Sequence, residues 1–396
     1  MSGPFDAGRN LAELAASEAW TPNLGAMRRI VVKIGSALLV DEASGAIRRG
    51  WLNALADDVA DLRARGVEVV LVSSGAIAVG RRRLGLTRRT IRLEEKQAAA
   101  ATGQLRLAHA YQETLARHDI TVAQVLVTLD DTEERRRHLN ARATVNALLR
   151  LGAVPVINEN DTVATSEIRF GDNDRLAARV AAMIDAEALV LLSDIDGLYT
   201  SDPKRDPDAA LIPRVDAITP EIEAMGGDAP PGYSSGGMVT KLAAARIALA
   251  AGSHMAIAQG RAKHPLARMQ ESGRCTWFVS QVEPQTARKR WIGGSLNPAG
   301  AITVDAGALK ALRAGKSLLP AGVTQVEGGF QRGDLVIVRA PDGHEVARGL
   351  AAYGGEDARL IRGHNSKDIE AVLGYRGREE LIHRDDLVVT EEGKRR

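Results

Sequence analysis

The sequence predicts an α/β fold, a three-layer α/β/α sandwich whose mainly parallel central sheet is covered by helices on both faces. Short aliphatic runs alternate along the chain with longer segments of helical periodicity. The predicted strands are apolar throughout instead of alternating, which is typical of strands buried on both faces. Polar residues gather directly after several strands, so we expect a ligand site at the carboxyl edge of this sheet.

Each element follows from a local pattern. Residues 30–34 are a β-branched run ended by Gly35 and Ser36, which predicts a buried strand. Similar apolar runs predict strands over residues 67–75, 121–127, 153–158 and 188–194. Helical spacing predicts helices over residues 51–66, 94–118, 132–152 and 238–252, the third with Thr132 as its N-cap. A further apolar helix follows the polar residues Asp172, Asn173 and Asp174.

The chain of 396 residues is too long for one ordinary domain. We expect residues 27–285 to form the α/β domain and residues 286–298, which are basic and then rich in Gly and Pro, to form a linker. Short alternating strands with Gly turns over residues 299–382 predict a second, small β-rich domain. Residues 1–26 are expected to be a disordered extension, and residues 383–396 a C-terminal tail.

Composition narrows the class of protein. Apolar residues make up 45% of the chain, which allows a large core, and the formal net charge of +2 does not call for nucleic acid or an anionic membrane as partner. Cys275 is the only cysteine, so the cytoplasm is the expected compartment. No apolar run approaches the roughly 20 residues that cross a bilayer, so no membrane partner is expected.

Common catalytic motifs are missing from the sequence. Gly315, Lys316 and Ser317 resemble the end of a Walker A loop, but Lys310 stands where the first Gly belongs, and Pro320 follows where a helix should run. The sequence has no HExxH, CxxC or GxSxG motif, so zinc hydrolysis and Ser-triad chemistry have no support.

A different kind of anion site remains. Lys33 lies within a predicted strand, where an unpaired ammonium is costly, and Gly35 and Ser36 leave backbone N–H groups free to approach an anion. The stretch 234–241 places Gly and hydroxyl residues at a helix start, with Lys241 one turn in, which suits a phosphate. The alternatives are a Lys at a strand end that reaches solvent and a flexible loop with a surface Lys.

Two carboxylates precede a helix that needs only one for its cap. With two lysines near a triphosphate, Asp172 and Asp174 are expected to hold Mg²⁺ through its waters or to align the lysines, and the chemistry indicated is phosphoryl transfer. Asp161 has no basic neighbour in the sequence, so we expect it to bind a cationic group of a substrate. The alternative for Asp161 is a turn-forming residue.

These motifs, in this order, resemble the glutamate 5-kinase family. They are VVKIGS, VSSGAIAVG, KQAAAATGQ, VPVINENDTVAT, the stretch from Phe170 to Leu176, SDIDGLYTSDP and SGGMVTK. The match begins near Arg28 and includes a C-terminal segment that is similar to a PUA domain, with AITVDAGA, KSLLPAGV and AVLGYRG. The resemblance implies an amino-acid kinase domain that phosphorylates the γ-carboxylate of L-glutamate from ATP with Mg²⁺, the first step of proline biosynthesis.

The resemblance also implies roles for individual residues. Lys33, Lys241, Asp174 and Asp172 would be catalytic, and Ser74, Asp161 and Asn173 would bind glutamate. ATP would contact Lys33, Ser193, Asp194, Ser235, Gly236, Gly237, Met238, Val239, Thr240 and Lys241, and would carry most of the contacts to Mg²⁺. Family membership further implies inhibition by proline, a dimer or tetramer, and transfer of the product to glutamyl phosphate reductase.

Two other readings stay open at this level. A related kinase would act on another acid, such as aspartate, N-acetylglutamate or a nucleotide, but an N-acetylated acid has no α-ammonium to satisfy Asp161. The second reading is RNA binding by the PUA-like segment, which carries Arg332, Arg339, Arg348, Arg359 and Arg362. Few aromatic residues are available there to stack on bases, which disfavours RNA as a partner.

Overall fold

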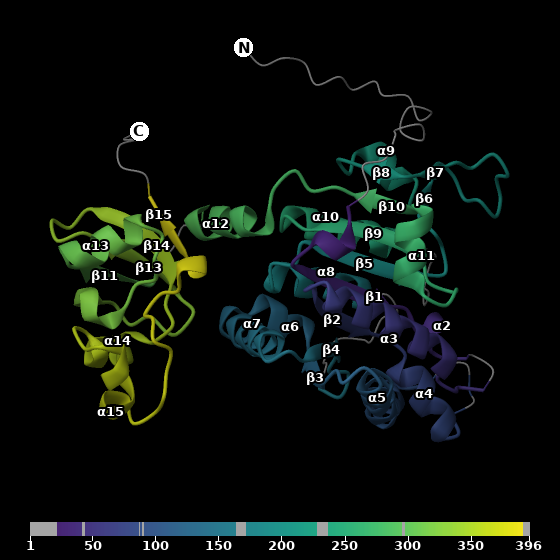
Figure 1. Ribbon diagram of the computed structural model, residues 1–396, viewed down its shortest axis with the longest axis horizontal. Helices are drawn as coiled ribbons and strands as arrows, with labels where there is room; N and C mark the ends of the chain where they lie inside the picture. The colour runs from purple at the N-terminus through teal and green to yellow at the C-terminus, as the bar shows by residue number, and fades with distance from the viewer. Residues whose placement is uncertain are drawn as a thin grey trace, which may run out of the picture. The chain divides into compact units, whose positions relative to one another are not determined.

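The computed structural model describes residues 22–41, 44–86, 88, 91–163, 172–227, 237–294 and 298–390. The chain divides into two compact units, which Figure 1 shows as ribbons. The N-terminal unit comprises Met1–Glu133 and Ala141–Pro284, and the C-terminal unit comprises Glu134–Asn140 and Gln285–Arg396. Within the described ranges, no helix is both long enough and apolar enough to cross a bilayer.

An eight-stranded sheet forms the centre of the N-terminal unit. Its strand order is β3 (Val122–Val127), β4 (Val154–Glu159), β2 (Glu68–Ser73), β1 (Arg29–Ile34), β5 (Ala188–Ser193), β9 (His254–Gln259), β10 (Cys275–Phe278) and β8 (Arg214–Val215). Neighbouring strands are parallel except β9 and β10. The chain moves from β1 toward β2 and later returns beside β1 as β5, so the strand order reverses there, which is where open α/β sheets bind ligands.

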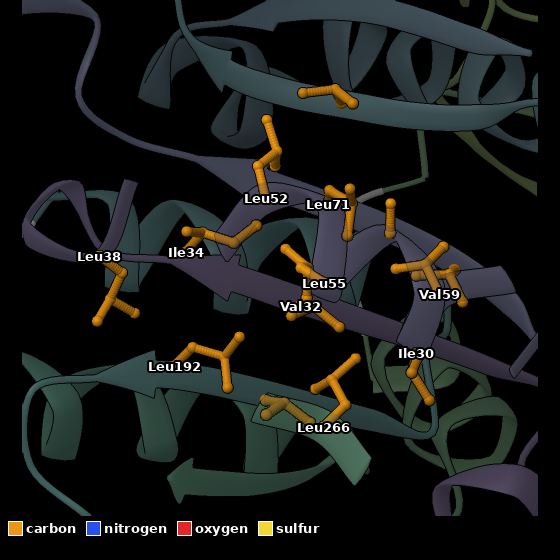
Figure 2. Packing of buried hydrophobic residues seen from close by; sticks show 14 of the residues in the cluster. Ile30, Val32, Ile34, Leu38, Leu52, Leu55, Val59, Leu71, Leu192 and Leu266 are labelled. Carbon is orange, nitrogen blue, oxygen red and sulfur yellow. The ribbon is translucent and has the colours of Figure 1, made fainter. Parts of the chain in front are cut away.

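Helices cover one face of this sheet around the side chains of Ile30, Val32 and Ile34. The helices of this face are α2 (Ser36–Leu39), α3 (Arg49–Ala64), α4 (Ala76–Arg83), α5 (Leu93–Ala116) and α11 (Pro265–Ser272). Figure 2 shows Leu52 and Leu55 of α3 over the β1 side chains. The strand residues are fully buried because the sheet is covered on both faces.

The opposite face is covered by α8 (Asp172–Met183) and α10 (Met238–Ala250), with the later turns of α7 (Arg135–Arg150) and α9 (Pro220–Ala224). Val31 and Leu189 pack on this side, whereas Val32 and Val190 pack on the first. Side chains along a strand alternate between the two faces, so Lys33 lies on the α8 and α10 side with Val31. The short elements of this unit are the 3₁₀ turn η1 (Leu24–Ala26), α6 (Leu129–Glu133) and the hairpin strands β6 (Leu198–Tyr199) and β7 (Leu211–Ile212).

Two expectations for the N-terminal unit are wrong. The helix predicted over 132–152 is two helices, α6 and α7, and the Thr132 hydroxyl donates to the carbonyl of Leu129 at 2.6 Å instead of capping a helix. The extension predicted to be disordered up to residue 26 is folded from residue 22. Leu24 is fully buried in the core, and its backbone N–H donates to Oε1 of Gln270 at 2.8 Å. Residues 1–21 lie outside the described part of the chain.

A five-stranded sheet forms the C-terminal unit, in the order β12 (Val323–Glu327), β11 (Gly300–Val304), β13 (Leu335–Arg339), β14 (Glu345–Leu350) and β15 (Leu387–Val389). The other elements are α12 (Pro284–Gly294), α13 (Ala306–Arg313), α14 (Gly355–Ile361) and α15 (Ile369–Leu373), with 3₁₀ turns η2 (Pro320–Gly322), η3 (Ser366–Asp368) and η4 (Arg384–Asp386). The segment expected to be a linker, residues 286–298, thus contains most of α12. The tail expected from residue 383 is wrong as well, because β15 pairs antiparallel with β14 and completes the sheet.

Candidate active site

One carboxylate joins two lysines at the carboxyl edge of the large sheet. Lys33 comes from β1, Asp174 from the first turn of α8 and Lys241 from the first turn of α10. The Lys33 ammonium lies 2.6 Å from Oδ1 of Asp174, and the Lys241 ammonium lies 3.0 Å from Oδ2. The three side chains are 10%, 1% and 7% exposed, in that order. Three distant segments of the sequence therefore meet in one buried charge cluster.

The charge on Asp174 is set by competing effects. Burial alone would raise the pKa of this carboxyl, but the two neighbouring ammonium groups outweigh burial and lower the pKa below its ordinary value. Asp174 is therefore ionised at neutral pH. The Thr240 hydroxyl can donate its proton either to Oδ2 of Asp174, at 3.2 Å, or to the Gly237 carbonyl, at 2.9 Å. The cluster holds two positive charges and one negative charge, so it attracts a further anion.

A neutral polar network lies beside the charge cluster. The Asn173 amide donates to the Ser74 hydroxyl at 2.7 Å, to the Ser73 carbonyl at 3.0 Å and to Oδ1 of Asn158 at 3.2 Å. Asn158 in turn donates to Gln104 of α5 at 2.7 Å. The network therefore joins β2, β4, α5 and α8. It holds the Ser74 hydroxyl against Asn173, which directly precedes Asp174 in α8.

Backbone geometry at Gly75 presents Ser74 to this network. Gly75 has a φ of +99° and precedes the first residue of α4, so the chain turns sharply between strand and helix. A residue with a Cβ atom would be strained there, because this left-handed region favours glycine. The added Cβ would also lie 3.0 Å from a methyl group of Val40.

Asp161 is a buried carboxylate just after β4. Its side chain belongs to a residue that is 8% exposed, and burial raises its pKa to about 6. Across the described ranges, no ion pair or hydrogen bond to its carboxylate is found. A buried carboxylate without a counterion is destabilising, and such a group is a candidate for a functional role.

The other half of the predicted site follows β5 and precedes α10. The Ser193 hydroxyl donates to Oδ1 of Asp194 at 3.2 Å, and the Gln259 amide of β9 donates to the Asp194 carbonyl at 3.2 Å. Gly237 is the N-cap of α10, so Met238, Val239 and Thr240 open the helix ahead of Lys241. Ser235 and Gly236 lie outside the described residues, as does the Asp172 side chain, although Asp172 begins α8.

Sequence reasoning missed two members of this region. Asn158 and Gln104 were not predicted as site residues, yet they link Asn173 to α5. Gln104 is the last residue of the KQAAAATGQ motif and Asn158 opens the polar end of VPVINEN. The signal was therefore present in both motifs, but only the folded chain shows that they touch.

Comparison with known proteins shows the family to which the chain belongs. The model of the amino acid kinase family matches residues 28–259, and the model of the PUA domain matches residues 300–373. A glutamate 5-kinase of Paramagnetospirillum magneticum (strain ATCC 700264 / AMB-1) is 64% identical over 366 residues, which cover 92% of this chain and 99% of that protein. A glutamate 5-kinase of Rhodopseudomonas palustris (strain TIE-1) is 61% identical over 369 residues, which cover 93% of this chain and 98% of that protein.

Among solved structures, a UMP kinase from Ureaplasma parvum is similar with a TM-score of 0.46 and 16% identity, covering 64% of this chain and 99% of that one; the assignment does not depend on it. The evidence for the family is the high identity over nearly the whole length of both sequences, together with the two domain matches. The chain belongs to the glutamate 5-kinase family and is a phosphotransferase of the amino-acid kinase type with a C-terminal PUA domain.

Proposed function

We propose that this protein transfers the γ-phosphoryl group of ATP to the γ-carboxylate of L-glutamate, giving L-glutamyl 5-phosphate and ADP. The observation that carries the proposal is the buried cluster in which Asp174 holds Lys33 and Lys241 at 2.6 and 3.0 Å. Phosphoryl transfer asks the protein mainly for positioning and for neutralisation of charge on the moving group. Two ammonium groups fixed by one carboxylate meet both requirements.

In this proposal the lysines reduce the repulsion between two anions. An oxygen of the γ-carboxylate forms a bond to the γ-phosphorus while the bond from that phosphorus to the ADP oxygen breaks. The γ-carboxyl of glutamate has an ordinary pKa of about 4.3, so it is already ionised at neutral pH and needs no general base. Lys33 and Lys241 would act where charge develops on the transferring group, and Asp174 would keep both ammonium groups in place.

We assign Mg²⁺ to the phosphates of ATP and not to Asp174. Both oxygens of Asp174 already contact an ammonium group, and a metal ion would have to displace one of them. Mg²⁺ commonly keeps several waters and is held through substrate phosphates, where it neutralises part of their charge. Asp172 begins α8 beside this cluster and is proposed to assist the metal or the substrate.

Glutamate is proposed to bind beside the lysines through Ser74, Asn173 and Asp161. The Ser74 hydroxyl and the Asn173 amide already touch at 2.7 Å and offer polar contacts to a carboxylate. The buried Asp161 carboxylate would pair with the α-ammonium of glutamate, and a charge-assisted hydrogen bond of this kind is strong where water is scarce. An N-acetylated acid lacks that positive charge.

ATP is proposed to lie over the ends of β5 and α10. Ser193 and Asp194 would bind the nucleoside side, and residues 235–241 with Lys33 would bind the phosphates. The N-terminus of α10 offers free N–H groups at Met238, Val239 and Thr240, which favour an anion. We further propose inhibition by proline at or beside the glutamate site, a dimer or tetramer, and delivery of the product to glutamyl phosphate reductase in proline biosynthesis.

The deciding experiment measures ADP release with a panel of acids. L-Glutamate, L-aspartate and N-acetyl-L-glutamate are supplied with ATP and Mg²⁺, each with and without proline. We expect turnover with glutamate at a kcat/KM well above the other two acids, and a rise in the apparent glutamate KM when proline is added. Faster turnover of aspartate or N-acetylglutamate would overturn the proposed substrate, and no effect of proline would overturn the proposed regulation only.

A further inference from the structure

A cationic cavity lies in the N-terminal unit, on the face of the sheet opposite the Lys33–Asp174–Lys241 cluster. Its volume is about 760 Å³, which falls within the range of small-molecule sites. Its charged lining, among the described residues, comprises the cations Arg48, Arg81, Arg82, Arg261 and Lys263 and the carboxylate Asp41. The lining is therefore strongly positive on balance.

The apolar residues of the cavity place it on the α3 side of the sheet. Leu38, Val40 and Trp51 line it and also belong to the core that packs against α3, whereas Asp174 and Lys241 lie on the α8 and α10 side. Figure 2 shows Leu38 next to Ile34, at the carboxyl end of β1. Gly35 and Ser36 directly follow β1, the strand that carries Lys33, and Ser36 lines the cavity.

The loop that carries Arg261 and Lys263 is held in shape by buried contacts. The Trp51 indole N–H is shared between the carbonyls of Gly260 and Ala262, at 2.7 and 3.1 Å. His264 lies 3.1 Å from the Asp58 carboxylate, which also accepts the backbone N–H of Leu266 at 2.9 Å. The two cations thus come from a fixed backbone, and less ordering is required when a ligand binds.

The contacts that the structure shows for Arg48, Arg81 and Arg261 neutralise only part of the positive charge of these three residues. Arg48 lies 3.4 Å from Asp41, and Arg261 lies 3.8 Å from Asp194. Arg81 donates to the backbone carbonyls of Leu86 and Arg88, which carry no net charge. Guanidinium groups around an apolar floor suit a small molecule with several phosphate or carboxylate oxygens.

We propose that this cavity is a second anion site, distinct from the phosphoryl-transfer cluster, that binds a small oligoanion with at least two negative charges. Pyrophosphate and citrate serve as probes of the two sources of such charge, phosphate and carboxylate. Binding is expected to weaken as ionic strength rises, because the cations of the cavity are open to solvent. The proposal is independent of which acid the enzyme phosphorylates.

Isothermal titration calorimetry with the full chain tests the site by measuring the affinity and stoichiometry of anion binding. Each probe is titrated in metal-free buffer containing a saturating non-hydrolysable ATP analogue, so that the nucleotide site is already filled. We expect at least one probe to bind with 1:1 stoichiometry. Lys263→Glu should weaken that binding by about tenfold or more, through loss of a charge-assisted contact and added repulsion. The matched control Lys367→Glu makes the same charge change at an exposed position of the C-terminal unit and should leave binding unchanged.

Three results would overturn the proposal. The first is that neither probe binds the wild-type chain. The second is that a probe binds when the ATP analogue is left out and does not bind when it is present, which would make the cavity part of the nucleotide site. The third is equal affinity in Lys263→Glu and in the wild type, with circular dichroism confirming that the variant is folded.

Discussion

Replacing Asp161 with Asn is expected to stabilise the ligand-free protein and weaken glutamate binding at the same time. The carboxylate is buried, and its pKa of about 6 is raised from an ordinary value of 3.8 because burial disfavours its charged form. Asn has nearly the same shape and no charge. A residue kept only for its turn geometry would tolerate this change with little effect on stability or on binding.

The size of the stabilisation follows from the raised pKa. Between pH 4 and pH 6 the folded chain holds the Asp161 proton more tightly than the unfolded chain, so the stability contributed by this group falls as pH rises through that window. The difference between 3.8 and about 6 corresponds to about 3 kcal/mol once the carboxyl is fully ionised above pH 7. Asp161→Asn should therefore raise the free energy of unfolding by about 1.5 kcal/mol at pH 5 and about 3 kcal/mol at pH 8.

Urea unfolding of the wild type and of Asp161→Asn at pH 5 and pH 8 measures this effect. Trp51 and Trp277 are buried in the core of the N-terminal unit, so tryptophan fluorescence follows its unfolding. Steady-state kinetics of the same proteins should show a large rise in glutamate KM and a small change in ATP KM. In the wild type, glutamate KM should rise as pH falls through about 6. A variant that is less stable than the wild type at pH 8 would refute the reasoning, as would equal rises in both KM values.

Three further substitutions test other parts of the structure. Lys241→Ala should lower kcat by ~10² or more with little change in glutamate KM, and an unchanged kcat would remove its phosphate role. Gly80→Ala should lower the free energy of unfolding by about 1–3 kcal/mol, because a Cβ would lie 1.8 Å from the Ala99 carbonyl oxygen. The control Gly50→Ala has room for its Cβ, so equal melting temperatures of the two variants would contradict this prediction. Asp174→Asn should lose about 3–5 kcal/mol of stability, since two buried ammonium groups lose their counterion, and thermal unfolding would show no shift if the pairs were unimportant.

Much of the large sheet could be predicted because its strands are buried on both faces. The predicted strand over 188–194 corresponds to β5 at Ala188–Ser193, and the one over 67–75 to β2 at Glu68–Ser73. Continuous aliphatic runs identify such strands without knowledge of their neighbours. Elements fixed by tertiary contacts could not be predicted. Leu24 is buried because it packs in the core on the α3 side of the sheet and its backbone N–H bonds to Gln270. The strand β15 forms because it pairs with β14.

The break between α6 and α7 shows the limit of periodicity. Apolar residues recur at helical spacing from Leu139 onward, and the polar residues 132–138 contain no Gly or Pro, so the sequence predicts a single helix. In the structure the Asp131 carboxylate accepts hydrogen bonds from the backbone and hydroxyl of Thr128, at 2.7 and 2.8 Å, at the start of α6. At the start of α7 the Glu134 carboxylate accepts the backbone N–H of Arg136 at 3.2 Å. Local side-chain to backbone bonds of this type compete with a continuous helix, and spacing does not reveal which will form.

Alternation along β1 explains why two charged sites can lie close in sequence and still be separate. Val31 and Lys33 lie on the α8 and α10 side, and Val32 and Ile34 on the α3 side, so the lysine necessarily meets Asp174 and not the cationic cavity. A shift of one residue in β1 would bury Lys33 among the aliphatic side chains of α3, without a counterion. Ser36 then begins α2 on the cavity side. An oligoanion bound in the cavity would thus contact the chain three residues from Lys33, and its effect on kcat would report any coupling between the two faces.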